Sequence, residues 1–315
     1  MYHFFVNLTA SNGQSKKRWK ALKKILDQKH ISYSLHLNHT SEEMAALVRK
    51  ITDTKEEPAH LVIVGGDGTL NLVLQNIQDF TKTKLSILPA GSGNDFARNM
   101  KVSKNLGEAL QHLLFSPTEH ILDYGEAYIT LAEEETVQLI EAPVYRRFLY
   151  GSGIGYDADI CVEVNESPLK RQLNRVGLGQ LAYVLMGIKQ VFSRTSCKAS
   201  LRIDGEEKNL ERLFFVTVMG HEYEGGGVPF CPQADPRDGY FDVCLVQAMP
   251  RITVFLAILL VYFRKHYIFR EVTAHRCKLM EIETDRPQWF HTDGEVLGPI
   301  KKVKYVNQTG LHVVT

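Results

Sequence analysis

The sequence predicts two regions, an α/β region followed by a mainly antiparallel all-β region. Three observations predict this: a length of 315 residues, alternating strand-like and helix-like segments in the first third, and a change to β-runs and tight turns near residue 119. The length exceeds the roughly 100–200 residues of most single domains, so two domains are expected. We place the boundary near residue 120, where the periodicity of the apolar residues changes.

The first third alternates short apolar strands with amphipathic helices. The strands are expected at Tyr2–Asn7, Tyr33–Asn38, His60–Val64 and Lys84–Leu88. The helices are expected at Ser15–Lys29, after a capping box that begins at Thr40, after the glycines at 65–68, and at Asp95–Met100 and Asn105–Phe115. Such alternation with short connections predicts a parallel sheet with helices packed on its faces.

The second region has the composition of antiparallel strands. Residues from Glu119 to about Ile160 and from Cys197 to Val246 form β-runs with hairpin turns such as Asp204-Gly205. Between them we expect one helix, roughly Gly179–Phe192. Its apolar side chains at helical spacing are expected to face inward: Leu181, Leu185, Ile188 and Phe192.

Composition excludes several classes of protein. Lys plus Arg total 37 against 36 Asp plus Glu, which argues against a nucleic-acid partner. The five cysteines are scattered without CxxC spacing, so neither a disulfide framework nor a zinc site is indicated. The longest apolar run, Ile252–Phe263, is shorter than the ~20 residues needed to cross a bilayer. With no signal peptide recognised, we expect a cytoplasmic protein, or one attached peripherally at the inner face of the membrane.

The stretch LVIVGGDGTLNLVL, residues 61–74, places Asp67 among glycines between a strand and a helix. In an open α/β sheet, ligands bind beyond the carboxyl ends of the strands, where backbone N–H groups are exposed. A carboxylate at such a site would repel phosphate unless a cation bridges them, which favours a nucleotide–Mg²⁺ site. The alternative is a tight turn in which Asp67 helps to cap a helix.

A second glycine-rich loop, LPAGSGNDFAR at residues 88–98, also leaves a strand and enters a helix. Two such loops at neighbouring strand ends would form one cradle. Neither a GxxxxGK[ST] loop nor a complete GxGxxG is present, so the usual nucleotide motifs are absent.

These loops resemble those of the bacterial diacylglycerol kinase-like lipid kinases, relatives of sphingosine and ceramide kinases. The resemblance continues through ILDYG (121–125), FLYGSGIGYDA (148–158), EYEGGGVPFCPQADPRDGYFDV (222–243) and TDGEVLG (292–298). It implies a Rossmann-like ATP-binding domain over 1–120, joined again by a returning segment at about 297–315, and a β-sandwich over 121–296. ATP would sit between the two domains.

The resemblance also assigns roles to residues. ATP contacts fall on Thr40, Gly65, Gly66, Asp67, Gly68, Thr69, Leu70, Asn71, Gly91, Ser92 and Asn94. Asp67 and Asp123 would serve the Mg²⁺ network, and Glu295 would be the general base toward the acceptor hydroxyl. Thr40 has an equal claim as a helix cap, and Asp123 could be a turn residue. The tripeptide of Glu295 also occurs at Asp204-Gly205-Glu206, so only its position favours Glu295.

Two further segments bear on the resemblance to this family. Asp235, Asp238 and Tyr240 lie in a stretch that resembles the structural Mg²⁺ loop of the family, or otherwise form a turn before a strand. The family's NPxSGxG-like loop is replaced by residues 7–13, NLTASNG, which puts nucleotide preference in doubt.

The predicted function is transfer of the γ-phosphate of ATP to a lipid hydroxyl, with diacylglycerol as the leading acceptor. The alternatives are a kinase of the NAD kinase and phosphofructokinase superfamily with a hydrophilic acceptor, and a non-catalytic regulatory protein that binds nucleotide or lipid. A lipid acceptor requires contact with a membrane. Candidate segments are the lysine face of the first helix and Ile252–Arg270, although such segments are more often solvated surface or core. An exposed sandwich edge would allow a homodimer.

Overall fold

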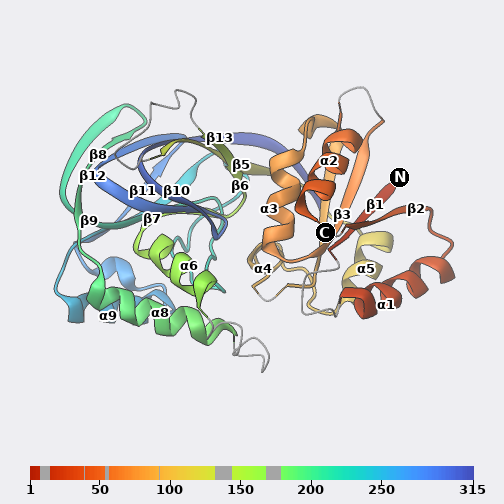
Figure 1. The fold of residues 1–315 in the computed structure, drawn as a ribbon, viewed down its shortest axis with the longest axis horizontal. Helices are drawn as coiled ribbons and strands as arrows, with labels where there is room; N and C mark the ends of the chain where they lie inside the picture. Colours follow the sequence, from red (N-terminus) through yellow and green to blue (C-terminus); the bar gives the residue numbers. More distant parts are fainter. Residues whose placement is uncertain (8–14, 39, 54–56, 92, 132–143, 168–178) are drawn as a thin grey trace. The chain divides into compact units, whose positions relative to one another are not determined.

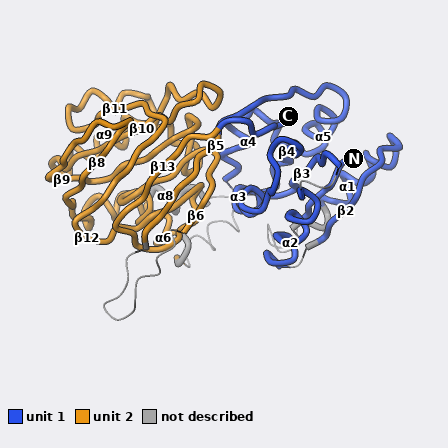
Figure 2. Tube along the Cα trace, turned by 90° about the horizontal axis from the view of Figure 1, so that it is seen from above, with its two compact units in different colours: residues 1–123, 309–315 blue, residues 124–308 orange. Residues whose placement is uncertain are grey.

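The computed structural model describes the chain of 315 residues except residues 8–14, 39, 54–56, 92, 132–143 and 168–178 (Figure 1). The chain divides into two compact units, residues 1–123 with 309–315, and residues 124–308 (Figure 2). Strands β5 (Glu119–Leu131) and β13 (Glu295–Val314) each run from one unit into the other. Among the described residues, no helix is both long and apolar enough to cross a bilayer.

The first unit is a parallel sheet with helices on both faces. Its elements are β1 (Tyr2–Asn7), α1 (Ser15–Gln28), β2 (Tyr33–Asn38), α2 (Ser41–Ile51), β3 (Ala59–Gly65), α3 (Asp67–Asn76), the 3₁₀ helix η2 (Phe80–Lys82), β4 (Thr83–Pro89), α4 (Asp95–Asn99) and α5 (Leu106–Phe115). The strand order is β13-β4-β3-β1-β2, and every neighbouring pair in it is parallel. The predicted α/β arrangement is therefore confirmed.

Burial on both faces explains why the central strands are apolar throughout. Phe4 and Val62 pack in a cluster with side chains of α1 and α5. Phe5 and Ile63, next to them in sequence, are also fully buried although their side chains point to the opposite face. Helix α1 contacts α5 and α2 contacts α3, one pair on each side of the sheet (Figure 1). The carboxyl ends of β3 and β4 are adjacent, because Gly65 is paired with Pro89.

The second unit is mainly antiparallel. Besides parts of β5 and β13, its elements are β6 (Val144–Phe148), β7 (Gly151–Gly155), α6 (Tyr156–Glu166), α8 (Gly179–Ser193), β8 (Cys197–Ile203), β9 (Glu206–Met219), β10 (Phe241–Gln247), α9 (Arg251–Val261), the 3₁₀ helix η3 (His266–Ile268), β11 (Val272–Cys277) and β12 (Leu279–Thr292). Strands β7 and β8 each pair with both β9 and β12, so the sheet doubles back on itself. Phe148, Phe241, Phe290 and Tyr305 fill the core that it encloses.

Two expectations for this unit were wrong. Helix α6 begins at Tyr156, although the β-run was expected to continue to about Ile160, because Gly155, with φ of 103°, ends β7 and starts a helix. In α8, Leu185 and Phe192 are exposed instead of facing inward. The inward side carries Gly187, whose carbonyl accepts a hydrogen bond from the Tyr156 hydroxyl at 2.9 Å, and the buried Val191.

Candidate functional site

The two glycine-rich loops meet backbone to backbone at the ends of β3 and β4. A Cβ atom on Gly91 would lie 2.5 Å from the Cα of Gly66, and one on Gly66 would lie 2.9 Å from the Cα of Gly91. The Ala90 N–H donates to the Gly65 carbonyl at 2.8 Å, which joins the loops further. Any side chain at Gly66 or Gly91 would therefore push the loops apart.

Asn94 fixes the shape of the second loop. Its side chain accepts from the Gly91 N–H and donates to the Gly91 carbonyl, both at 2.9 Å. Its own backbone is left-handed, with φ of 54°, a conformation that asparagine tolerates. The predicted contact residues Gly91 and Asn94 are thus parts of one closed loop. Ser92, predicted between them, lies outside the described residues.

Asp67 links the loops through its side chain. Its carboxylate accepts hydrogen bonds from the N–H groups of Asp95 at 3.1 Å and Phe96 at 3.3 Å, at the start of α4. Burial, together with the nearby Asp95 charge, raises the pKa of Asp67 to about 6 despite these bonds. A Cβ on Gly93 would lie 2.9 Å from Asp67 Oδ2, so that glycine gives the carboxylate room.

The start of α3 has features of an anion-binding site. Its N-cap is Gly66, which has no side chain and so forms no side-chain capping hydrogen bond. The following residues Thr69, Leu70 and Asn71 are buried and anchor the helix. N–H groups at such a helix start attract phosphate groups through hydrogen bonding and the helix dipole.

Other predicted ATP and Mg²⁺ residues have separate environments. Thr40 forms the expected capping box with Glu43: its hydroxyl accepts from the Glu43 N–H at 3.2 Å, and its own N–H donates to the Glu43 carboxylate at 3.4 Å. Asp123 is buried in β5 at the end of the first unit. The altered loop at residues 7–13 lies outside the described residues apart from the backbone of Asn7.

Glu295 follows a tight turn in the second unit. Asp293 and Gly294 both have positive φ, 49° and 78°, and connect β12 to β13. The Asp293 carboxylate accepts bonds from three successive N–H groups, those of Leu149, Tyr150 and Gly151, at 2.9–3.3 Å. Glu295 itself is exposed. The turn is therefore fixed by a buried aspartate, while the glutamate after it points to solvent.

The repeated tripeptide forms the same type of turn. Asp204 and Gly205 have φ of 46° and 96°, and the Asp204 carboxylate accepts from the N–H groups of Lys278 and Leu279. The difference lies in burial, since Asp293 is buried and Asp204 is exposed. The tripeptide alone predicts the turn and not a catalytic role.

The predicted metal loop is held by arginines. Asp235 accepts from the backbone and side chain of Arg237, and Asp238 forms a 2.5 Å ion pair with Arg276. The Arg276 guanidinium also lies over the Tyr240 ring, 4.3 Å from its centroid. Both carboxylates therefore have cationic partners in the protein, and a metal ion there would have to share them.

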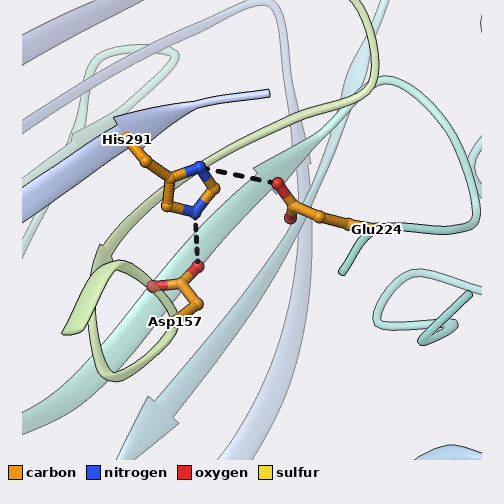
Figure 3. Close-up of side chains that lie close together, drawn as sticks. All are labelled: Asp157, Glu224 and His291. Atoms are coloured by element: carbon orange, nitrogen blue, oxygen red, sulfur yellow. Dashed lines mark hydrogen bonds and ion pairs between the residues drawn. The ribbon is translucent and has the colours of Figure 1, made fainter. Parts of the chain in front are cut away.

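Sequence reasoning missed a buried charged cluster in the second unit, formed by Asp157, Glu224 and His291 (Figure 3). Nε2 of His291 lies 3.3 Å from Asp157 Oδ2, and Nδ1 lies 3.6 Å from Glu224 Oε1. Burial alone would lower the pKa of His291, but the carboxylates of Glu224, Asp157 and Asp293 outweigh it and raise the pKa to about 9. The raised pKa favours a charged ring between the two carboxylates, whereas the Gly294 N–H, 3.2 Å from Nδ1, favours a neutral ring that accepts a hydrogen bond there.

Glycines make room for this cluster. A Cβ on Gly153 would lie 1.7 Å from Asp157 Oδ2, and one on Gly151 would lie 2.7 Å from Glu224 Oε2. Ser152, between them, points to the other face and donates to the His291 carbonyl at 2.7 Å. The glycines of GSG were thus a signal for buried carboxylates, and His291 lies just two residues before the turn that carries Glu295.

Comparison with known proteins identifies two domains along the chain. Residues 1–126 match the model of the diacylglycerol kinase catalytic domain, and residues 152–315 match the YegS C-terminal NAD kinase beta sandwich-like domain. The chain is 26% identical to a Bacillus subtilis protein named "Putative lipid kinase YtlR", over 94% of each chain. It is 24% identical to a protein of Mycobacterium tuberculosis named "Diacylglycerol kinase", over 82% of this chain and 75% of that protein.

A solved structure has the same fold. It is described as "A putative diacylglycerol kinase from Bacillus anthracis str. Sterne", with a TM-score of 0.76 and 18% identity over 99% of this chain and 96% of that one. At 18% identity this similarity shows the fold alone. The two domain matches together span nearly the whole chain, in the expected order. The chain therefore belongs to the bacterial diacylglycerol kinase-like family of lipid kinases.

Proposed function

We propose that this lipid kinase transfers the γ-phosphoryl group of ATP to the hydroxyl of diacylglycerol. The observation that carries the proposal is the contact between Gly66 and Gly91, which joins two loops beside the start of α3, where the N-cap Gly66 has no side chain. A ligand can approach backbone N–H groups closely there because no Cβ intervenes. The Mycobacterium tuberculosis relative named "Diacylglycerol kinase" supports diacylglycerol as the acceptor.

The residues of the first unit suit a triphosphate and its metal ion. In the proposal Gly65 to Asn71, with Gly91, Ser92 and Asn94, hold the phosphates. Asp67 would hold Mg²⁺ directly or through water, and Asp123 would support it. The raised pKa of Asp67 in the free protein is consistent with a carboxylate whose ionised form a bound cation would stabilise. Bound Mg²⁺ would neutralise charge on the phosphates.

The residues of the second unit would act on the acceptor. Glu295 takes the proton from the lipid hydroxyl, the oxygen forms a bond to the γ-phosphorus, and the bond to ADP breaks. The turn at Asp293 would hold the Glu295 backbone in place, because the Asp293 carboxylate accepts hydrogen bonds from three backbone N–H groups. An exposed side chain leaves Glu295 accessible to an acceptor.

The test is transfer of labelled γ-phosphate from ATP with Mg²⁺ to a panel of hydroxylated acceptors in mixed micelles. The panel contains diacylglycerol, phosphatidylglycerol, a sphingoid base and a polyprenol, with NAD as the hydrophilic acceptor. Phosphorylation of diacylglycerol above the others supports the proposal. Transfer to another lipid or to NAD would replace the acceptor, and ATP binding without transfer to any of them would favour a regulatory protein.

A further inference from the structure

Helix α9 is apolar on both of its faces. Val254, Ala257 and Val261 are buried against the second unit. The opposite side carries Ile252, Leu256 and Leu259, which are exposed at helical spacing, and the exposed Phe263 follows in the turn after the helix. Exposure reaches 65% for Ile252 and 71% for Phe263. A helix that is apolar all round is normally buried, so the outward row predicts a surface that becomes covered.

The neighbouring helix extends this surface. Helix α8 contacts α9, and its exposed side chains Leu185 and Phe192 lie two turns apart on one side of that helix. We call these two residues with the four outward residues of Ile252–Phe263 the α8–α9 face. Figure 1 shows both helices on the same side of the second unit. The exposed residues thus come from two helices that contact each other.

The two segments that form this face, α8 and residues 251–270, contain Lys and Arg but no Asp or Glu. Residues 251–270 contain Arg251, Arg264, Lys265 and Arg270 and no Asp or Glu, and α8 contains Lys189 alone. Acidic neighbours pair with three of the cations, since Arg264 contacts Glu222, Arg270 contacts Glu271 and Lys189 contacts Glu163. Such pairs are weak at the surface, and the Arg270 side chain is still 92% exposed.

We propose that the α8–α9 face docks the second unit onto an anionic lipid bilayer, its apolar side chains entering the interface and Lys265 and Arg270 contacting the headgroups. Apolar residues flanked by cations suit the surface of an anionic bilayer. The choice of a bilayer rests on the proposed function, because its lipid acceptor resides in a bilayer. A second copy of the chain fits less well, because a symmetric contact would bring the same cations together.

The test is co-sedimentation with unilamellar vesicles of phosphatidylcholine alone or mixed with phosphatidylglycerol. We expect the double variant Ile252→Gln/Phe263→Gln to lose about tenfold in partition coefficient for each side chain. Phe115→Gln is the matched control, because Phe115 is 54% exposed on α5 in the other unit, and it should bind as the wild type does. Equal binding of the double variant and the wild type, or no binding of the wild type to either vesicle, would overturn the proposal.

Charge and self-association give two further readouts. Lys265→Gln/Arg270→Gln should weaken binding about fivefold per charge on vesicles with phosphatidylglycerol and leave binding to phosphatidylcholine unchanged. Sedimentation velocity tests the second copy: a wild-type dimer that Ile252→Gln/Phe263→Gln converts to monomer would assign the face to self-association and overturn the proposal.

Transfer to a short-chain diacylglycerol dissolved as monomers separates this inference from the proposed function. The Ile252→Gln/Phe263→Gln variant should phosphorylate the dissolved acceptor at the wild-type rate and lose activity only toward vesicles. A wild type that binds vesicles but phosphorylates no acceptor would refute the proposed function and leave the docking surface standing.

Discussion

The backbones of Gly66 and Gly91 touch, so that a Cβ on either residue would lie within 3 Å of the other's Cα atom. This contact holds the end of β3 against the end of β4 and defines the spacing of the candidate phosphate loops. Residues 25 positions apart thereby depend on each other, and neither can change alone.

Gly91→Ala should separate the loops. We expect a loss of about 1–3 kcal/mol in the free energy of unfolding, as for other overpacked sites, and about a hundredfold loss of activity from misplacement of the loops. Gly107→Ala is the control, because its Cβ would meet only side-chain atoms, the nearest at 3.3 Å. Chemical denaturation and transfer assays measure both effects, and a Gly91→Ala enzyme as active as the control would contradict the contact's importance.

Asp67 should make stability fall as pH rises from about 4 to 6. Its folded pKa of about 6 exceeds the unfolded value, so the folded state binds more protons in this window and ionisation costs about 3 kcal/mol. Above pH 6 this contribution is constant. The difference in unfolding free energy between wild type and Asp67→Asn, measured across this window, should change by that amount; a constant difference would contradict the raised pKa.

His291 should make stability fall in a higher pH range, from about 6.5 to 9. Its folded pKa of about 9 exceeds the unfolded value near 6.5, so its stabilisation is complete below pH 6.5 and is lost as pH rises to 9. The loss should be about 3 kcal/mol for wild type and absent from His291→Gln. That variant should also be less stable by about 3–5 kcal/mol at neutral pH, because Asp157 and Glu224 would lose their buried cation. A wild-type stability that is flat from pH 6.5 to 9 would show a neutral ring.

The loop at Asp235–Tyr240 has two interpretations, a turn held by arginines and a metal site, and they predict different responses to Mg²⁺. The Asp238–Arg276 pair predicts that Arg276→Gln lowers the melting temperature of the metal-free protein. If Mg²⁺ also binds there, as the family resemblance predicts, added Mg²⁺ without nucleotide should raise the melting temperature, and Asp238→Asn should abolish that rise. Calorimetry with and without chelator measures both, and no response to Mg²⁺ would exclude the structural metal.

The sequence predicted the parts of the fold that depend on local periodicity. The β1 strand begins and ends at the expected residues, and the Thr40 capping box starts α2. Helix α6 was missed because its start depends on the conformation of Gly155 after an apolar run that reads as strand. Leu185 and Phe192 were placed inward because apolar spacing does not reveal which side of a helix meets its neighbour.

The candidate site was predictable where motifs are contiguous. The glycine loops and the turn before Glu295 could be located from sequence, but the Gly66–Gly91 contact joins two separate segments and requires the fold. The same is true of His291, whose two carboxylate partners lie 134 and 67 positions earlier in the chain. Its raised pKa depends on that three-dimensional arrangement.

The most direct measurement compares Glu295→Gln with Glu206→Gln, two glutamates that follow the same Asp-Gly turn. Both side chains are exposed, so each variant should keep its unfolding free energy within about 0.5 kcal/mol of the wild type. Transfer of γ-phosphate to diacylglycerol should fall by about 10²–10⁴-fold in Glu295→Gln, with ATP binding unchanged, and remain at the wild-type rate in Glu206→Gln. Full activity of Glu295→Gln would contradict the assignment of the general base.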